Sequence, residues 1–120
     1  MSDAPLAEPG CLFCRVVAGE LPSDVVRTGE RTLAFRDIAP QAPTHVLVVT
    51  RDHYPDLAAL VAADPGLAAT LAADAVAVAD QERLDAGYRL VVNTGREGGQ
   101  TVGHVHVHVL GGRHMEWPPG

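Results

Sequence analysis

Apolar and polar positions alternate most strictly near the C-terminus, where residues 103–113 read GHVHVHVLGGR. Successive side chains of a strand point to opposite faces, so the valines would share one face and the histidines the other. A helix would scatter the histidines, and β-branched valine favours a strand. The pattern therefore predicts a strand with a buried valine face and an imidazole face formed by His104, His106 and His108. A solvated strand face, or a metal-binding histidine tract, is the alternative.

The remaining apolar pattern predicts two helices and four further strands. Helical spacing indicates a short helix at residues 11–19 and a long, alanine-rich helix from residue 64 to about residue 85. Runs typical of strands lie at residues 25–28, 32–35, 45–50 and 88–93, the first two forming a hairpin. We also expect a helical turn or two within residues 54–62. This order predicts an α+β domain whose mostly antiparallel sheet has about five strands.

Length and composition fit one domain, at residues 11–120, with a core of small aliphatic residues. The 120 residues are 47% apolar but only 4% aromatic, so burial of apolar surface between two copies would help stability. The net charge is −6 and no basic patch is present, which argues against duplex nucleic acid as a partner. No window is apolar enough to span a membrane. Residues 1–10 lack a signal core, so we expect a disordered lead-in and a cytoplasmic protein.

A glycine-rich loop, residues 98–101 with the sequence GGQT, comes just before the histidine strand. Successive backbone N–H groups of such a loop can hold an anion. Beside imidazoles, this predicts a phosphoryl-transfer site that needs no metal. No lysine follows, so the loop is not a P-loop, and an ordinary turn is the alternative reading.

The two cysteines form a Cys11-x-x-Cys14 pair near the N-terminus. In the compartment expected here they are thiols or metal ligands rather than a structural disulfide. A thioredoxin-like redox role is disfavoured because the pair does not follow a strand. Two ligands are half of what a structural zinc ion needs.

Taken together, these motifs resemble the signature of the histidine triad (HIT) superfamily over roughly residues 11–120. The likeness is carried by the histidine strand and by Asn93, Gly95, residues 99–102 (GQTV) and residues 111–113 (GGR) around it. The segment DIAPQAPTH at residues 37–45 is similar to the upstream motif of that superfamily. The ending WPPG at residues 117–120 resembles the branch of histidine triad nucleotide-binding proteins.

The resemblance implies hydrolysis of a nucleoside phosphoramidate or related nucleotide ester. His106 would attack the α-phosphorus, and water would release a nucleoside monophosphate from the resulting nucleotidyl-histidine. His45, His104 and His108 would complete the catalytic cluster, with the backbone carbonyl of His104 orienting His106. Thr101 would lie near the leaving group. No catalytic cofactor is implied.

The same resemblance implies a pocket for a purine nucleotide such as AMP or adenosine phosphoramidate, and a homodimer with one continuous sheet. Asp37 would bind the ribose, and Trp117 would reach the active site of the partner subunit, unless the tail is simply free. The apolar residues are also consistent with plain core burial. The implied nucleotide-binding residues are Leu12, Phe13, Val16, Phe35, Asp37, Ile38, Leu47, Asn93, Gly99, Gln100, Thr101, Val102, His108 and Trp117.

A structural zinc site is also implied, on Cys11, Cys14, His53 and His104. The alternative is a pair of reduced cysteines beside an exposed His53. One departure from the pattern is Gly103, where the superfamily often has proline or a bulkier residue, and this glycine would loosen the turn or the leaving-group side of the pocket.

Three alternative functions stay open: a hydrolase with a catalytic metal on the histidines, a nucleotide-binding module with little turnover, and a dinucleoside polyphosphate hydrolase. The WPPG ending disfavours the last. Nucleotidyl transfer is disfavoured because the branch that performs it typically has glutamine where this chain has His108.

Overall fold

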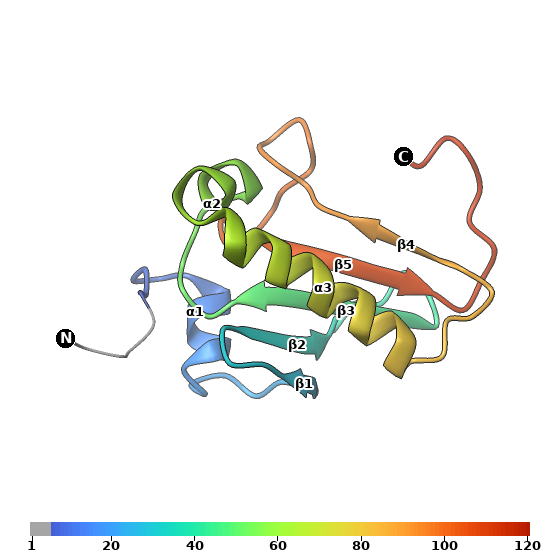
Figure 1. The fold of residues 1–120 in the computed structure, drawn as a ribbon, viewed down its shortest axis with the longest axis horizontal. Coiled ribbons are helices and arrows are strands. Elements are labelled where there is room, and N and C mark those ends of the chain that lie inside the picture. Colours follow the sequence, from blue (N-terminus) through green and yellow to red (C-terminus); the bar gives the residue numbers. More distant parts are fainter. Residues whose placement is uncertain (1–5) are drawn as a thin grey trace.

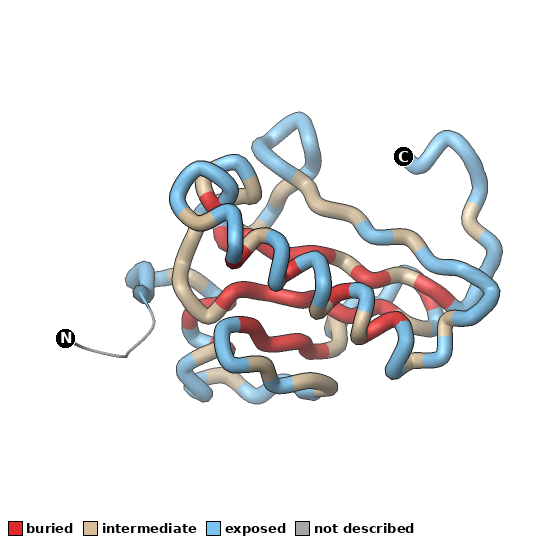
Figure 2. The backbone as a smooth tube through the Cα atoms, in the orientation of Figure 1, coloured by how far each residue is buried: buried red, intermediate tan, exposed pale blue. Residues whose placement is uncertain are grey.

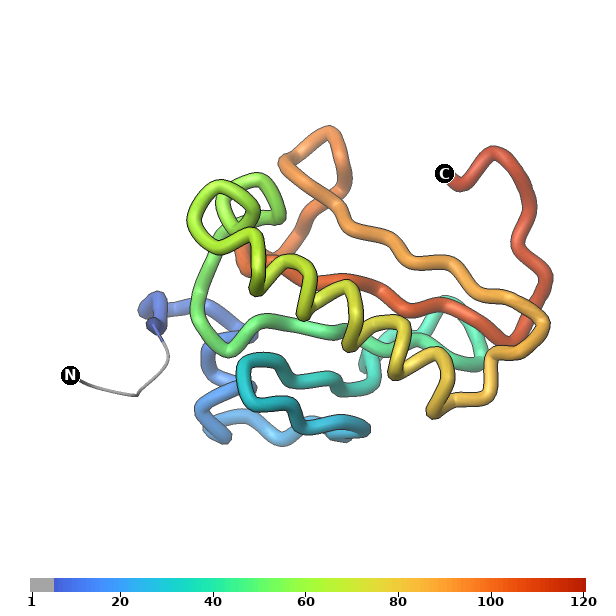
Figure 3. The backbone as a smooth tube through the Cα atoms, viewed as in Figure 1, coloured from blue at the N-terminus to red at the C-terminus, as the bar shows by residue number. Residues whose placement is uncertain are grey.

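A computed structural model describes residues 6–120, in which one antiparallel sheet carries helices on both of its faces (Figure 1). The elements in chain order are α1 (Leu12–Val17), β1 (Val25–Thr28), β2 (Thr32–Arg36), β3 (Thr44–Thr50), α2 (Leu57–Ala63), α3 (Pro65–Gln81), β4 (Tyr88–Val91) and β5 (His106–Gly111). The spatial order of the strands is β1-β2-β3-β5-β4, and all neighbours are antiparallel. The last strand of the chain therefore lies between β3 and β4 (Figure 3).

Alternation along the central strands divides the apolar residues between two cores. On β5, Val107 and Val109 pack with Leu67 and Leu71 of α3, and these four side chains are almost completely buried. On β3, the alternate residues Leu47 and Val49 belong to a second cluster on the opposite face, together with residues of α1. Figure 2 shows the buried backbone running along these central strands. The sheet is thus covered on both sides where β3 and β5 meet.

The histidines lie on the face that carries α1. His106 is paired with Val49 across the β3–β5 ladder, and His108 is paired with Leu47. Residues directly opposite in a ladder share a face. Phe13 of α1 packs against the His106 ring, with the ring centroids 5.1 Å apart. The helix therefore covers one end of the imidazole row and leaves His108 partly accessible.

The predicted α+β fold with a five-stranded antiparallel sheet is confirmed, with differences at element ends. There are three helices rather than two, because residues 57–63 form a separate helix, α2. The long helix ends at Gln81 instead of about residue 85, because Arg83 adopts a left-handed φ of 58° and redirects the chain. This turn brings Leu84 back against the core. The strand predicted at residues 88–93 ends at Val91.

The histidine strand begins later than predicted, at His106. His104 lies in a bend, where its N–H donates to the carbonyl of Val102, and the Val105 N–H donates to the carbonyl of Tyr54. These contacts replace ladder pairing before His106. His104 is still fully buried, so the bend keeps it inside the protein.

Residues 6–10 also differ from the predicted disordered lead-in, whose residues 1–5 lie outside the described range. The Leu6 N–H donates to the Asp52 carboxylate at 2.8 Å, and the Leu6 carbonyl accepts from the His53 N–H at 2.8 Å. These bonds fix the segment to the loop after β3. Within residues 6–120, no helix is long and apolar enough to cross a membrane.

Candidate active site

The ring of His106 is held by the backbone two residues earlier. Its Nδ1 lies 2.7 Å from the carbonyl oxygen of His104, and a carbonyl can only accept a hydrogen bond. The proton therefore sits on Nδ1, and Nε2 keeps its lone pair. His106 is only 5% exposed but lines a pocket. The lone pair on Nε2 is therefore accessible to a ligand bound in that pocket and is largely shielded from bulk water.

His45 and His108 form a second chain of hydrogen bonds with a defined direction. The Gln41 N–H donates to Nδ1 of His45 at 3.0 Å, so a neutral His45 carries its proton on Nε2. That Nε2 lies 2.9 Å from Nδ1 of His108 and 3.5 Å from the Asp37 carboxylate. His45 thus donates to His108, and the remaining N–H of His108, on Nε2, is free to donate to an anion.

Burial keeps these imidazoles neutral at physiological pH. Desolvation lowers the pKa of His108 to about 4, with smaller contributions from the neighbouring His106 and His45. Burial likewise lowers the pKa of His45, while the nearby Asp37 carboxylate opposes this shift. A neutral His108 leaves no buried charge uncompensated and still has one ring N–H to donate.

Because of these depressed pKa values, we expect the protein to lose stability as pH falls. An unfolded chain takes up a proton on histidine near pH 6.5, whereas the folded chain does so on His108 only near pH 4. The unfolded state therefore binds more protons in this window, and the stabilisation present above pH 6.5 is lost progressively towards pH 4.

The urea concentration at the midpoint of unfolding should fall steadily from pH 7 to pH 6 to pH 5. In His108→Gln the fall should be shallower, whereas His114→Gln, a change at an exposed histidine, should leave it unaltered. A midpoint that stays constant from pH 7 to pH 5 would contradict this expectation.

A pocket of about 420 Å³ opens in front of His106 and His108. It is lined by all of the apolar residues that the sequence had suggested for a base, namely Leu12, Phe13, Val16, Phe35, Ile38 and Leu47. Phe13, Phe35 and Leu47 are buried and also serve the core, while Ile38 is fully exposed at the rim. Asp37, Thr101 and Val102 complete the polar and loop side of the same pocket. The structure thus brings most of the predicted nucleotide-binding residues together.

Four of the predicted nucleotide-binding residues do not line this pocket, namely Asn93, Gly99, Gln100 and Trp117. The Gln100 side chain braces its own loop, donating to the carbonyls of Pro55 and Val102 and accepting from the Gly95 N–H. Gly99 has a φ of +82°, which only glycine adopts without strain, so it shapes the turn. Trp117 is 83% exposed on the tail.

The pocket also has walls that the sequence reasoning missed. Leu21, Pro22 and Ser23 in the connection after α1, and Arg36 at the end of β2, line it as well. No periodicity or motif marks the connection. The only sequence feature that could have indicated these residues is that the connection joins the helix that carries Phe13 to the hairpin whose second strand carries Phe35.

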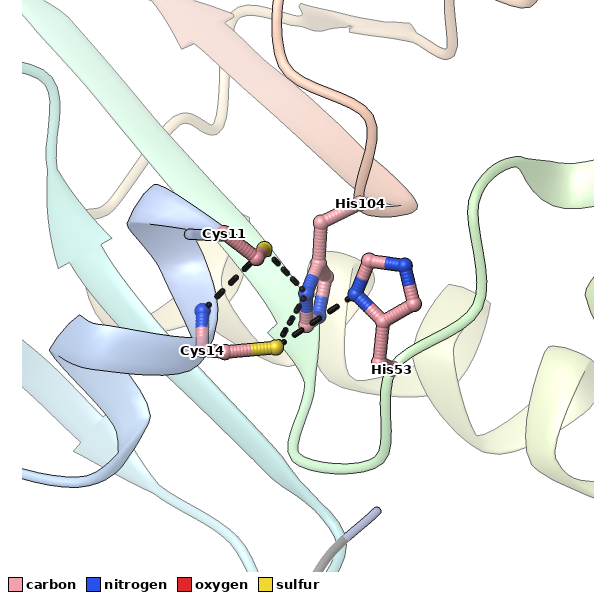
Figure 4. Close-up of side chains that lie close together, drawn as sticks. All are labelled: Cys11, Cys14, His53 and His104. Carbon is pink, nitrogen blue, oxygen red and sulfur yellow. Dashed lines mark hydrogen bonds between the residues drawn. The ribbon is translucent and has the colours of Figure 1, made fainter. Parts of the chain in front are cut away.

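The four predicted zinc ligands converge at the end of the imidazole row (Figure 4). Cys11 and Cys14 project from the start of α1, His53 from the loop after β3, and His104 from the bend before β5. The cysteine sulfurs lie 3.3 Å and 3.5 Å from Nδ1 of His104, and the Cys14 sulfur lies 3.4 Å from Nδ1 of His53. His104 is therefore both a member of this cluster and, through its carbonyl, the partner of His106.

This cluster fits a tetrahedral zinc ion. Zn–S and Zn–N bonds of about 2.3 and 2.0 Å at tetrahedral angles place sulfur and nitrogen about 3.5 Å apart, close to the separations found here. The Nε2 of His104 lies 2.7 Å from the carbonyl of Thr50, so its proton is on Nε2 and the Nδ1 lone pair faces the sulfurs. The N–H groups of Cys14 and Glu8 donate to the Cys11 and Cys14 sulfurs, respectively. Such bonds stabilise thiolates, the form that binds metal.

Comparison with known proteins finds relatives that match nearly the whole chain in sequence and in fold. The model of the HIT domain family matches residues 18–115. The "14 kDa zinc-binding protein" of Zea mays is 47% identical over 111 residues, which cover 91% of this chain and 87% of that protein. Among solved structures, a HIT family hydrolase from Legionella pneumophila has a TM-score of 0.89 at 46% identity, covering 92% of this chain and 100% of that one. A histidine triad nucleotide-binding protein from Candida albicans has a TM-score of 0.78 at 28% identity, covering 91% and 83%.

Proposed function

The chain belongs to the HIT family, and we propose that it hydrolyses a purine nucleoside phosphoramidate, or a related nucleotide ester, through a nucleotidyl intermediate on His106. The observation that carries the proposal is the 2.7 Å contact between Nδ1 of His106 and the carbonyl of His104, at a pocket that has an apolar wall and a polar side with Asp37, Thr101 and His108. A buried imidazole held in this tautomer is a nucleophile that needs no proton removed from its attacking nitrogen.

In the first step, the lone pair on Nε2 of His106 forms a bond to the α-phosphorus, and the phosphorus–nitrogen bond to the leaving group breaks. The electron pair of that bond goes to the leaving nitrogen, which takes a proton from solvent and departs as an amine. In the second step, water attacks the same phosphorus and gives up a proton to solvent, the electron pair of the bond to His106 returns to Nε2, and a nucleoside monophosphate such as AMP is released. The histidine is regenerated, so no cofactor is consumed.

The other residues hold the phosphate and the nucleoside. The Nε2 proton of the neutral His108 points away from His45 and is the donor placed to meet a phosphate oxygen. The backbone N–H groups of Thr101 and Val102 and the Thr101 hydroxyl are proposed as further donors next to the pocket, whereas the Gln100 N–H already donates to the carbonyl of Gly95. Asp37 is proposed to bind the ribose hydroxyls, and the apolar wall formed by α1 and β2 to hold the base.

We propose that the cluster of Cys11, Cys14, His53 and His104 binds zinc in a structural role. Two ligands come from α1, and the other two come from the loops at one end of the central strands. A bound ion would tie the helix that covers His106 to the sheet. All four positions of a tetrahedral site are filled by protein, which is typical of structural zinc.

The test of the proposed function is turnover of adenosine 5′-phosphoramidate in the presence of a chelator, with rapid quenching. We expect AMP release and, in the quenched sample, protein carrying one adenylyl group on a peptide that contains His106. A second group of possible ligands, Asp37, His45 and His108, lies beside the same pocket, which Asp37 and His108 line, and favours a catalytic metal as the rival reading. Activity that chelation abolishes while the protein remains folded, and that added metal restores in Cys14→Ser as well, would support that rival. AMP binding without turnover would identify a binding module, and turnover of dinucleoside polyphosphates alone would identify the other hydrolase branch.

We also propose that the protein is a homodimer joined through β4. This strand is at the edge of the sheet, and its Tyr88 and Leu90 are 42% and 38% exposed. An unpaired edge with apolar side chains is a template for pairing with a second chain. In such a dimer, Trp117 is proposed to reach the partner's pocket.

The dimer is expected to show in solution as a particle of twice the 12.6 kDa chain mass. Light scattering after size-exclusion chromatography should give the doubled mass for the wild type and the single-chain mass for Leu90→Arg, which places a charge on the proposed interface. Val61→Arg, at a position on α2 that is also exposed, is the matched control and should stay dimeric. A wild type of single-chain mass at micromolar concentration would refute the dimer.

A further inference from the structure

A second, larger hollow lies beside the nucleotide pocket. It has a volume of about 760 Å³ and is formed by residues 8–12 on one side and residues 101–103 on the other, with His53 and Pro55 completing the wall. We call it the N-terminal groove. Both segments lie at the end of the sheet where β5 begins (Figure 1). Three residues, Leu12, Thr101 and Val102, line both hollows, so the groove and the pocket meet across them.

We propose that the N-terminal groove receives the leaving group of the substrate and prefers an amine that carries a second positive charge. This inference rests on the proposed function. Displacement at phosphorus proceeds in line, so the leaving group departs on the side away from the attacking nitrogen. His106 lines the nucleotide pocket but not the groove. The groove is thus the adjoining space that a group turned away from His106 can enter.

The charge preference follows from Glu8. Its carboxylate is the acidic side chain among the groove residues, and no ion pair within residues 6–120 involves it. The groove contains no arginine. The backbone of Glu8 is fixed on both sides, because its N–H donates to the Cys14 sulfur and its carbonyl accepts from the Cys11 N–H at 3.1 Å. A carboxylate on an anchored backbone, with no cationic partner among residues 6–120, attracts a cationic ligand.

Gly103 gives the groove its width. Its φ does not lie in the left-handed region, and a Cβ built on it would meet no atom within 4 Å. Neither backbone strain nor packing therefore requires glycine at this position. Any larger side chain here would extend from the groove wall into open space. We infer that Gly103 sets the size of leaving group that the enzyme accepts.

The test compares three adenosine phosphoramidates, whose leaving groups are ammonia, pentylamine and 1,4-diaminobutane. The last two have the same number of non-hydrogen atoms and differ in the distal charge. The wild type should favour the diamine over pentylamine by about two- to fivefold in kcat/KM, the range of an exposed ion pair. Raising the salt concentration should reduce this preference. Glu8→Gln should abolish it, and Asp85→Asn, at an exposed carboxylate near the opposite end of β5, should retain it.

Gly103→Leu should lower kcat/KM for both substituted amines about tenfold or more relative to the ammonia compound, because it fills the space they occupy. Gly103→Ala is the matched control, with a smaller loss in the same direction. Equal loss on all three substrates would overturn the inference, since it would mean that residue 103 acts through the bend of His104. An unchanged diamine preference in Glu8→Gln would overturn the charge assignment. A wild type that hydrolyses none of the three would instead overturn the proposed function, and the inference with it.

Discussion

Replacing His106 with alanine is expected to slow release of AMP from adenosine phosphoramidate by about four orders of magnitude or more. The loss is this large because the nucleophile itself is removed, and the rest of the site can only bind and polarise the substrate. The variant should still bind AMP, since the apolar wall of α1 and β2 and the donor on His108 are untouched. His108→Ala should cost less, about 10²–10³-fold, as expected for loss of one phosphate donor.

Turnover and AMP affinity, measured side by side on His106→Ala and on His114→Ala, would check this expectation. His114 is exposed on the tail and does not line the nucleotide pocket, so its removal controls for the loss of an imidazole as such. Retention of most of the activity in His106→Ala would exclude the covalent route. Loss of both turnover and AMP binding would point to damage of the pocket rather than of the chemistry.

Cys14→Ser is expected to remove bound zinc and to lower the free energy of unfolding by about 4 kcal/mol, the stabilisation given by a ligand present at about a thousand times its dissociation constant. Cys14 is 6% exposed and its sulfur contacts both histidines of the cluster, so its loss opens the centre of the site. Metal analysis should find one zinc per wild-type chain and none in the variant. For a domain of this size, the melting temperature should fall by about 10–15 °C.

A chelator offers a second way to reach the same state. It should destabilise the wild type by a similar amount and have no further effect on Cys14→Ser, because both remove the same ion. Arg15→Ser, an exposed neighbour on α1, serves as the control and should keep both the metal and the stability. A purified wild type that contains no zinc and is indifferent to chelation would show that the cluster is a set of reduced thiols and neutral imidazoles.

Much of the fold could be predicted because alternation on the central strands is strict. Val107 and Val109 face α3 while His106 and His108 face α1, as the period of two requires. The ends of the elements could not be predicted in the same way. The long helix ends four residues early because the chain turns at Arg83 and packs Leu84 against the core. Helix propensity is a local property and does not predict an end that tertiary packing sets.

In the candidate site, too, some features could be predicted from the sequence and others depend on tertiary contacts. The resemblance to the HIT superfamily implied that His106 is the nucleophile, that the His104 carbonyl orients it and that four residues bind a metal, and the structure brings these residues together. The roles within the glycine-rich loop depend on contacts made far away in the chain. The Gln100 side-chain amide donates to the carbonyl of Pro55, 45 residues earlier. Glu8 lies at the groove only because Cys14 and Asp52 hold residues 6–8 by hydrogen bonds. No local pattern contains that information.

The group that orients His106, the proposed nucleophile, is a carbonyl of the peptide backbone. Every amino acid at position 104 supplies the same carbonyl oxygen, so no substitution there deletes the acceptor of the His106 proton. What a substitution can alter is where that oxygen lies, because the imidazole of His104, held by Thr50 and the cysteine cluster, anchors the bend. Mutational scans would therefore record position 104 as sensitive while the atom responsible persists in every variant. A designer who removed the metal cluster would need new contacts that hold this bend in place. No new catalytic group would be needed.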